Sequence, residues 1–383
     1  MRNIQKQRAL ALVLVLIILS SLCLSACGKA KDNGSDSPTP TEETVATATP
    51  TISPTSTPSP EPTASPTPTV TPIPEGMMRS DITNEWVKEE IAKARPIAVM
   101  LNNKEEAVPQ SGISRAGLVY EAPTEVDIQR LLAIIEDYSD LEKIGSVRSS
   151  RHYYIDWMLE WDAIYCHFGG SVYANNILKR SDIHNLDGMA LDGTTYYRTK
   201  DRVAPHNAYT AGDRIIKEAE RRKYPLTHTD KYVSGHFKFA DEENPNLLEG
   251  GFDATYASPG YPLNKPWFEY NAEEGVYYRF QYGDKHIDEM NGEQLSYTNI
   301  IFQYCKWKGM GDGTSRIDIT TIDSGRKGYY ITMGKAIPIT WSKTSEREPT
   351  RYFDMDGNEI KLNTGKTWIC IIKDTYADQT DIH

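Results

Sequence analysis

The stretch Pro96-Ile97-Ala98-Val99-Met100-Leu101 decides the fold class of this chain. Six consecutive residues without a polar side chain are typical of a strand that is buried on both faces of a sheet. Three further apolar runs follow it at Gly117–Tyr120, Ile128–Ile135 and Ala163–Cys166. The run at Ile128–Ile135 is compatible with either a strand or a helix, whereas the other two predict strands.

Helical patterns alternate with these strands. They cover Glu85–Ala94, Tyr153–Glu160 and Thr210–Arg222. Ser149 or Ser150 is the predicted cap of the second helix, and Thr210 with Asp213 resembles a capping box for the third. Strands that alternate with helices predict a mixed α/β domain, which we place at 78–227.

The pattern changes after Pro225 to short strands rich in aromatic and β-branched residues. These predicted strands are Val276–Phe280, Thr298–Cys305, Ile317–Ile322, Tyr329–Met333, Ile337–Trp341, Tyr352–Met355 and Thr367–Ile372. Asp356-Gly357 is a hairpin-turn signal between two of them. The second domain, at 228–383, is therefore predicted to be mostly antiparallel β, and the fold class of the whole chain is α+β.

The first 26 residues have the pattern of a lipoprotein signal peptide: a basic start, an apolar core and the lipobox Leu24-Ser25-Ala26-Cys27. Cleavage before Cys27 and its acylation, with palmitate among the fatty acids, would anchor the protein to the extracytoplasmic face of the cell membrane. A retained transmembrane helix is the alternative, but the apolar run is shorter than the ~20 residues that a span needs. Residues 27–77 are rich in Ser, Thr and Pro and predict an unfolded tether.

Charge and cysteine content exclude several classes of protein. The formal net charge of −11 argues against a nucleic-acid partner, which requires a basic face. After removal of the signal peptide and acylation of Cys27, three cysteines remain, at Cys166, Cys305 and Cys370. Because all three lie in apolar runs and their number is odd, we expect buried free thiols rather than a disulfide framework.

An ordered series of short motifs resembles the YerB-like lipoproteins, a bacterial family with a domain of unknown function. The motifs are Arg95-Pro96-Ile97-Ala98-Val99-Met100, Pro109-Gln110-Ser111-Gly112, Val119-Tyr120-Glu121-Ala122-Pro123, Val147-Arg148-Ser149-Ser150-Arg151, His167-Phe168-Gly169-Gly170-Ser171 and Ala204-Pro205-His206-Asn207-Ala208-Tyr209-Thr210. They cover most of the first domain, and the β-rich part resembles the family's second domain more loosely. The resemblance implies a two-domain extracytoplasmic lipoprotein and no particular reaction.

The segment Arg148-Ser149-Ser150-Arg151 is the best candidate for an anion site. Two arginines at the start of a helix can clamp a phosphate or carboxylate bidentately, and the helix N-terminus adds partial positive charge. The alternative is a helix cap with internal salt bridges to Glu121 and Glu125. Arg198 and Arg202 complete the predicted ligand-binding set.

Four residues are candidates for acid–base catalysis: Glu121, Glu125, His167 and His206. The two carboxylates follow a predicted strand and have Arg130 nearby, so a structural ion-pair cluster is the alternative. His167 ends a strand at the edge where open α/β sheets place ligands. His206 lies in a proline-led loop, where backbone hydrogen bonding is the alternative role.

The remaining motifs indicate neither a metal nor a cofactor. Asp354-Met355-Asp356-Gly357-Asn358 fits a hairpin turn better than a calcium loop. The Tyr-rich strands could present a face to a glycan or a protein, or could simply pack against each other. We therefore expect a binding or scaffold lipoprotein with a cell-wall or protein partner. The alternative is a cell-envelope hydrolase or transferase.

Overall fold

The structure is a computed structural model that describes residues 74–383. The predicted signal peptide at 1–26, the predicted lipidation site Cys27 and all but the last residues of the predicted tether lie outside the described residues. Within 74–383, no helix has the length and apolar character that crossing a membrane requires.

The largest sheet of residues 74–383 has eleven strands and includes all four apolar runs of the first half. Its spatial order is β12 (Phe252–Asp253), β22 (Lys335–Ser342), β21 (Arg326–Thr332), β18 (Asn299–Cys305), β25 (Thr367–Lys373), β4 (Leu118–Pro123), β5 (Gln129–Ile135), β3 (Ile97–Asn102), β7 (Ile164–His167) and β8 (Asn185–Asp187), with β23 (Arg351–Phe353) beside β22. The pairs β18–β25, β25–β4, β3–β7 and β7–β8 are parallel, and the other neighbours are antiparallel. The α+β class is confirmed, and the ambiguous run Ile128–Ile135 is a strand.

The sheet passes without a break from the first half of the chain to the second. Strand β25, near the C-terminus, pairs in parallel with β4, which places Thr367 opposite Leu118 and Ile369 opposite Tyr120. Every residue of both strands is buried. The two halves on either side of residue 227 therefore share one sheet, and the described residues belong to one compact unit.

Both faces of the large sheet are covered. Helix α3 (His152–Glu160) packs on one face, where Trp157 joins the core of Met100 and Ile301. On the opposite face, Val99 joins a core that contains Ile215 of helix α6 (Gly212–Arg221). Alternate residues of β3 from Ile97 to Leu101 thus enter different cores, which explains why all five are apolar.

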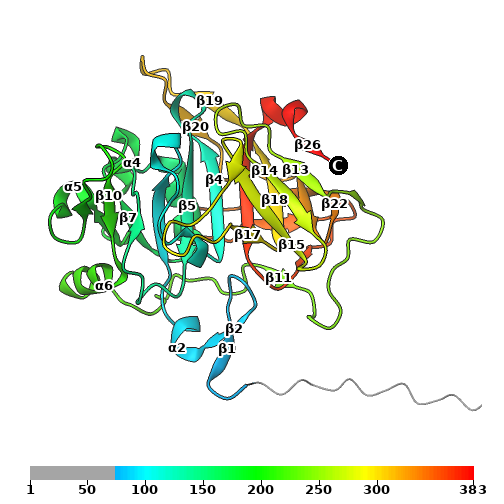
Figure 1. The fold of residues 1–383 in the computed structure, drawn as a ribbon, viewed down its shortest axis with the longest axis horizontal. Helices are drawn as coiled ribbons and strands as arrows, with labels where there is room; N and C mark the ends of the chain where they lie inside the picture. The colour runs from blue at the N-terminus through cyan, green and yellow to red at the C-terminus, as the bar shows by residue number, and fades with distance from the viewer. Residues whose placement is uncertain (1–73) are drawn as a thin grey trace, which may run out of the picture. The chain divides into compact units, whose positions relative to one another are not determined.

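A second sheet lies on the same face as α6. Its strands from residues 256–297 are drawn in yellow-green and yellow in front of the large sheet, and its last strand, at the C-terminus, is red (Figure 1). Its order is β16 (Asp284–Lys285), β15 (Val276–Gln281), β14 (Trp267–Asn271), β13 (Tyr256–Ser258) and β26 (Asp381–Ile382), with β17 (Ser296–Tyr297) also beside β15. Phe268 and Tyr277 point inward to the core. The intervening residues on β14 and β15 point away from it.

The remaining elements are short. They are β1 (Met77–Arg79), β2 (Trp86–Lys88), α2 (Glu89–Ala92), η1 (Glu105–Ala107), η2 (Ile113–Arg115), η3 (Glu125–Asp127), β6 (Ile144–Gly145), α4 (Val172–Ile177), α5 (Gly188–Leu191), β9 (Tyr197–Arg198), β10 (Ala208–Thr210), β11 (Lys238–Phe239), β19 (Trp307–Gly309), β20 (Ile317–Ile319), β24 (Lys361–Leu362) and η4 (Asp374–Gln379). β11 pairs in parallel with β24 within the second half. β20 connects the two halves, since its Asp318 carboxylate lies 2.8 Å from His152 Nε2 of α3.

Three details of the predicted helices are wrong. Glu85–Ala94 is a strand, β2, followed by the single helical turn α2, because Trp86 to Lys88 pair with β1. Helix α3 has Arg151 as its N-cap residue, without a side-chain cap bond, so neither predicted serine caps it. Thr210 lies in β10 and its hydroxyl donates to the Thr195 carbonyl, so α6 starts without the predicted capping box.

Other local predictions are confirmed. Cys166, Cys305 and Cys370 are free and buried. The Asp356-Gly357 turn follows β23, where the Asp354 carboxylate accepts hydrogen bonds from the backbone of Asp356 and Asn358. The carboxylate thus stabilises the turn, as expected for a hairpin rather than a calcium loop.

Candidate functional site

The candidate site lies where β3, β4 and β7 reach their carboxyl ends. Strand β5 begins at the same edge, which places Arg130 opposite Asn102. The segment that carries Arg148 runs between β3 and β7: its N–H donates to the Met100 carbonyl at 2.8 Å, and its carbonyl accepts from the Phe168 N–H at 3.0 Å. This edge is where open α/β sheets usually bind ligands.

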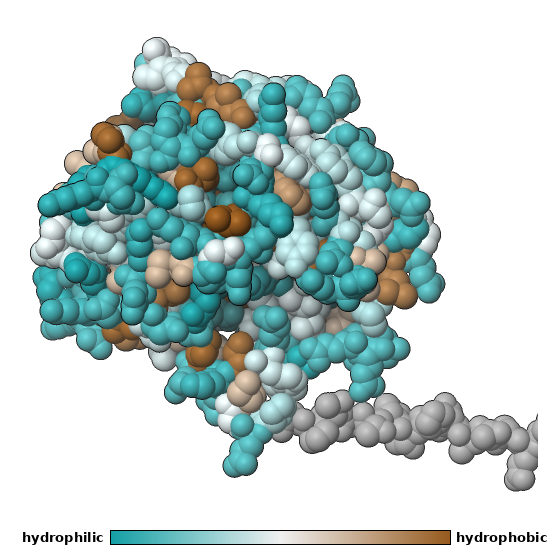
Figure 2. All heavy atoms as spheres, in the orientation of Figure 1, coloured by the Kyte–Doolittle hydropathy of each residue, from teal (hydrophilic) through white to brown (hydrophobic). Residues whose placement is uncertain are grey.

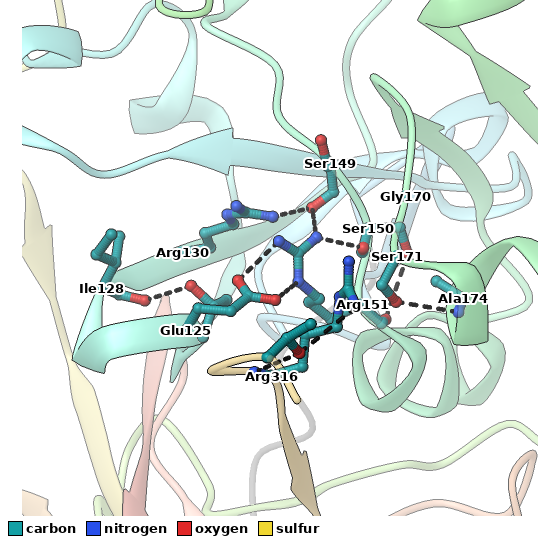
Figure 3. A network of polar contacts seen from close by, with 12 residues as sticks. Glu125, Ile128, Arg130, Ser149, Ser150, Arg151, Gly170, Ser171, Ala174 and Arg316 are labelled. Atoms are coloured by element: carbon teal, nitrogen blue, oxygen red, sulfur yellow. Dashed lines mark hydrogen bonds and ion pairs between the residues drawn. The ribbon is translucent and has the colours of Figure 1, made fainter. Parts of the chain in front are cut away.

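Three arginines converge here, Arg130, Arg148 and Arg151, and we refer to them as the arginine cluster. Nε and one terminal nitrogen of Arg151 each donate to the Glu125 carboxylate at 2.7 Å (Figure 3). Arg151 also donates to the Ser150 carbonyl at 2.7 Å, and Arg130 donates to the Ser149 carbonyl. The Arg151–Glu125 pair is thus one of the salt bridges that the structural alternative predicted.

Arg148 differs from its two neighbours. The side chain is half-buried, and its Nε atom is buried without a hydrogen-bond partner. No ion pair or hydrogen bond holds this guanidinium within residues 74–383. The predicted pairing of Arg148 with Glu121 is wrong, since Glu121 is bound elsewhere.

The electrostatics of the arginine cluster reflect an excess of positive charge. Burial, followed by the charges of Arg151 and Arg148, lowers the pKa of Arg130 to about 10. Burial and the charge of Arg151 likewise lower the pKa of Arg148. For Glu125 burial raises the pKa, but the hydrogen bonds and charge of Arg151 outweigh it, so the pKa is lowered and the carboxylate is ionised. Three guanidiniums and one carboxylate remain, and their mutual repulsion favours a bound anion.

Glu125 is held in place by an unusual loop. Val126 and Asp127 of η3 have φ values of 50° and 56°, a left-handed conformation that costs a β-branched residue energy. Lys373 and the Tyr376 hydroxyl bind the Asp127 carboxylate and thereby tie this loop to the end of β25. The C-terminal half of the chain thus helps to position the carboxylate that orients Arg151.

His206 reaches the same edge from the loop before β10. Asn102 Oδ1 accepts from the Lys104 N–H, so its Nδ2 donates to His206 Nδ1 at 2.8 Å. This assignment leaves the proton of the neutral ring on Nε2. Burial and the nearby charge of Arg148 lower the pKa of His206 below its usual range, so the ring is neutral at pH 7.

The other predicted site residues have hydrogen-bond partners of their own. His167 is buried, and its two ring nitrogens contact the Gly169 carbonyl and Asn185 Oδ1. Arg198 donates to Asp192 and Asn207, and Arg202 donates to two backbone carbonyls of the loop after β3. Among the described residues, no hydrogen bond joins His167 to His206.

Glu121 is part of a buried network between the two halves of the chain. Its two carboxylate oxygens accept from one Arg279 nitrogen at 2.9 and 2.8 Å, and both side chains are fully buried. Trp368 Nε1 and Asn264 Nδ2 also donate to the same carboxylate, at 3.0 and 2.8 Å. With its lone pairs occupied in this way, Glu121 has a structural role.

Asn102 and Arg130 belong to the site, although the predicted binding set did not include them. A signal for Arg130 existed, because a single arginine within the apolar run Ile128–Ile135 is unusual for a buried strand. For Asn102 no local signal existed. Among residues 74–383, no three His, Cys, Asp or Glu side chains are grouped so as to hold a metal ion.

Comparison with known proteins gives relatives that match most of the chain. Residues 82–225 match the model of "Protein of unknown function (DUF3048) N-terminal domain", and residues 256–369 match that of the corresponding C-terminal domain. The chain is 30% identical over 312 residues to "Putative lipoprotein YerB" of Bacillus subtilis (strain 168), covering 78% of this chain and 88% of that protein. The crystal structure of the YerB protein from Bacillus subtilis matches with a TM-score of 0.70 at 27% identity, covering 80% of this chain and 99% of that chain.

Proposed function

Because this chain belongs to the DUF3048 family, we propose that it is a membrane-anchored binding protein of the cell envelope whose arginine cluster binds an anionic group. The predicted resemblance to the YerB-like lipoproteins is confirmed. The family name carries no reaction, so the proposed ligand rests on the geometry of the site.

The observation that carries the proposal is the unpaired guanidinium of Arg148 beside Arg130 and Arg151. A phosphate or carboxylate near Arg148 would accept charge-assisted hydrogen bonds and offset the repulsion among the three arginines. Ser149 and Ser150 lie between the two arginines of the predicted motif, but their hydroxyls bind the Phe168 and Arg151 carbonyls. We therefore assign direct ligand contacts to the guanidiniums and not to the serines.

His206 gives the proposed site a pH dependence. A bound anion would stabilise the protonated ring, and so the pKa of His206 should rise when the site is occupied. By linkage, the affinity for the anion should then increase as the pH falls through the pKa range of this histidine.

The hydrolase or transferase alternative has less support. Glu121, Glu125 and His167 have their polar atoms engaged in internal hydrogen bonds. Of the four candidates, His206 alone keeps a ring nitrogen without a hydrogen bond within residues 74–383. General acid–base catalysis needs a group within hydrogen-bond reach of the substrate proton that it transfers. We therefore propose binding and not catalysis.

Replacing Arg148 by Ala should weaken the binding of inorganic phosphate by about 10- to 100-fold, because a charge-assisted contact contributes ~1.5–3 kcal/mol. Titration calorimetry at low salt measures this loss. The melting temperature should stay equal or rise, because the change removes a repelling charge and leaves no carboxylate unpaired.

Arg198→Ala is the matched control, since Arg198 is exposed and already paired with Asp192. It should bind phosphate like the unmodified protein. Equal phosphate affinity in Arg148→Ala and in the unmodified protein would refute the proposed site.

The anchor is tested separately with Cys27→Ala, which removes the residue that the lipobox presents for acylation. Metabolic labelling with an alkyne fatty acid should give a labelled band for the unmodified chain and none for the variant. Labelling that persists in the variant would place the lipid on another residue or exclude the lipoprotein anchor.

A further inference from the structure

The outward face of the second sheet carries a groove that is separate from the arginine cluster. The groove has a volume of about 1000 Å³ and runs over β14, β15 and β17. This sheet faces the reader in Figure 1, and the surface above it in Figure 2 has pale and teal residues rather than a continuous brown patch. A volume of this size is within the range of ligand-binding clefts.

Strand register places aromatic and polar side chains in two adjacent rows across this face. One row contains Trp267, Phe280 and Lys285, and the other contains Tyr256, Glu269, Tyr278 and Ser296. Neighbouring strands lie ~4.8 Å apart, so consecutive side chains in a row are separated by about the length of one sugar ring.

Two aromatic rings that line the groove, Phe280 and Tyr278, are held by neighbouring side chains. Trp267 stacks on Phe280 with ring centroids 4.9 Å apart and ring planes 7° apart, and its Nε1 donates to Glu269 at 2.7 Å. The Tyr278 hydroxyl donates to Glu274. Rings fixed in this way lose little conformational entropy when a ligand binds.

The charges of the groove select the kind of ligand. Glu269, Glu273 and Glu293 line it together with a single cation, Lys285. Carboxylates beside aromatic rings are the chemistry that binds ammonium groups, through ion pairing and cation–π attraction. An anionic polymer would be repelled by the same carboxylates.

The other lining groups favour a hydroxyl-rich ligand over a peptide. Asn271, Gln294 and Ser296 line the groove, and the Ser296 hydroxyl and Lys285 ammonium bind no other side chain within residues 74–383. Ala272 is the single aliphatic residue in the lining of this part of the described chain. Apolar peptide side chains would therefore find no pocket, whereas sugar hydroxyls would find hydrogen-bond partners.

We propose that this groove binds a linear glycan whose sugars carry free amino groups. The amino groups contact the carboxylates and rings, and the hydroxyl groups contact Asn271, Gln294 and Ser296. This inference does not depend on the arginine cluster, because the groove and the cluster share no residue.

A glucosamine hexamer is the probe, and the fully N-acetylated hexamer is its uncharged counterpart of equal length. The probe is tested on the whole chain without its signal peptide. Its affinity for the glucosamine hexamer should exceed its affinity for the acetylated hexamer by about tenfold or more, since one cation–π contact and one ion pair together account for that ratio. Phe280→Ala should reduce the affinity about tenfold. The double variant Glu269→Gln, Glu273→Gln should abolish the preference for the charged hexamer.

Phe252→Ala is the matched control, because Phe252 is an exposed phenylalanine on β12 of the other sheet. This control and Arg148→Ala should both bind the hexamer like the unmodified protein. If Phe280→Ala does not fold, the double variant Glu269→Gln, Glu273→Gln tests the proposal on its own, since glutamine preserves the shape of the glutamate side chain. Equal binding of both hexamers, equally tight binding of a lysine hexamer, or no binding by the unmodified protein would overturn the proposal.

Discussion

Replacing Glu121 by Ala is expected to destabilise the folded protein by about 3–5 kcal/mol, because it leaves the guanidinium of Arg279 buried without a counter-charge. Arg279 is fully buried over the ring of Trp368, with its guanidinium carbon 4.2 Å from the ring centroid. Equilibrium denaturation in urea, followed by tryptophan fluorescence, measures the change. Trp368 contacts both Glu121 and Arg279, so its fluorescence reports on this ion pair directly.

The control for this prediction is Asp253→Ala, which breaks the exposed pair with Lys335 on the edge of the same sheet. Exposed ion pairs contribute only ~0–1 kcal/mol, so the control should unfold nearly like the unmodified protein. A Glu121→Ala variant as stable as this control would show that Glu121 is not structural and would restore it as a candidate catalytic residue.

A fragment containing only residues 74–227 is expected not to fold on its own. Strand β4 would lose its parallel neighbour β25, so a fully buried strand would become an open sheet edge. Glu121 would also lose Arg279, Trp368 and Asn264, which all belong to the second half. Circular dichroism melting and size-exclusion chromatography should show no cooperative transition and an aggregated species.

Co-expression of residues 74–227 with residues 228–383 provides the positive arm of this experiment. The two fragments should form a stable one-to-one complex, because the contacts across β4 and β25 do not require a covalent link between the halves. A monomeric 74–227 fragment that melts cooperatively would instead establish two independent domains, as the change in sequence pattern at Pro225 suggested.

Local patterns in the sequence were sufficient for most strands of the large sheet, but not for β8 and β12 or, in the second sheet, for any strand other than β15. Runs such as Pro96–Leu101 and Thr367–Ile372 were recognisable because strands that are buried on both faces of a sheet have nearly continuous apolar sequences. Helix caps were less predictable. The serines before α3 favour a cap by their chemistry, but the Ser149 hydroxyl donates to the distant Phe168 carbonyl and the Ser150 hydroxyl to the adjacent Arg151 carbonyl instead.

For the candidate site, the sequence indicated the right segment and only part of its surroundings. Arg148 and Arg151 lie where the motif placed them, and Glu125 pairs with Arg151 as the structural alternative required. Arg130 and Asn102 belong to the site because β5 pairs antiparallel with β3, which places the two residues opposite each other. His167 does not belong to the site, because its two ring nitrogens contact the Gly169 carbonyl and Asn185 Oδ1.

The sequence by itself determined most strands of the large sheet, that the cysteines are buried and free, and to which family the chain belongs. These properties depend on residue type and on spacing over a few positions, where backbone preference and burial act directly. Only the tertiary structure decided that the two halves share one sheet, that Glu121 binds Arg279 and that Arg148 lacks a partner. Glu121 and Arg279 are 158 positions apart, and no local preference specifies which distant strand or charge a residue meets when the cores of the sheet close.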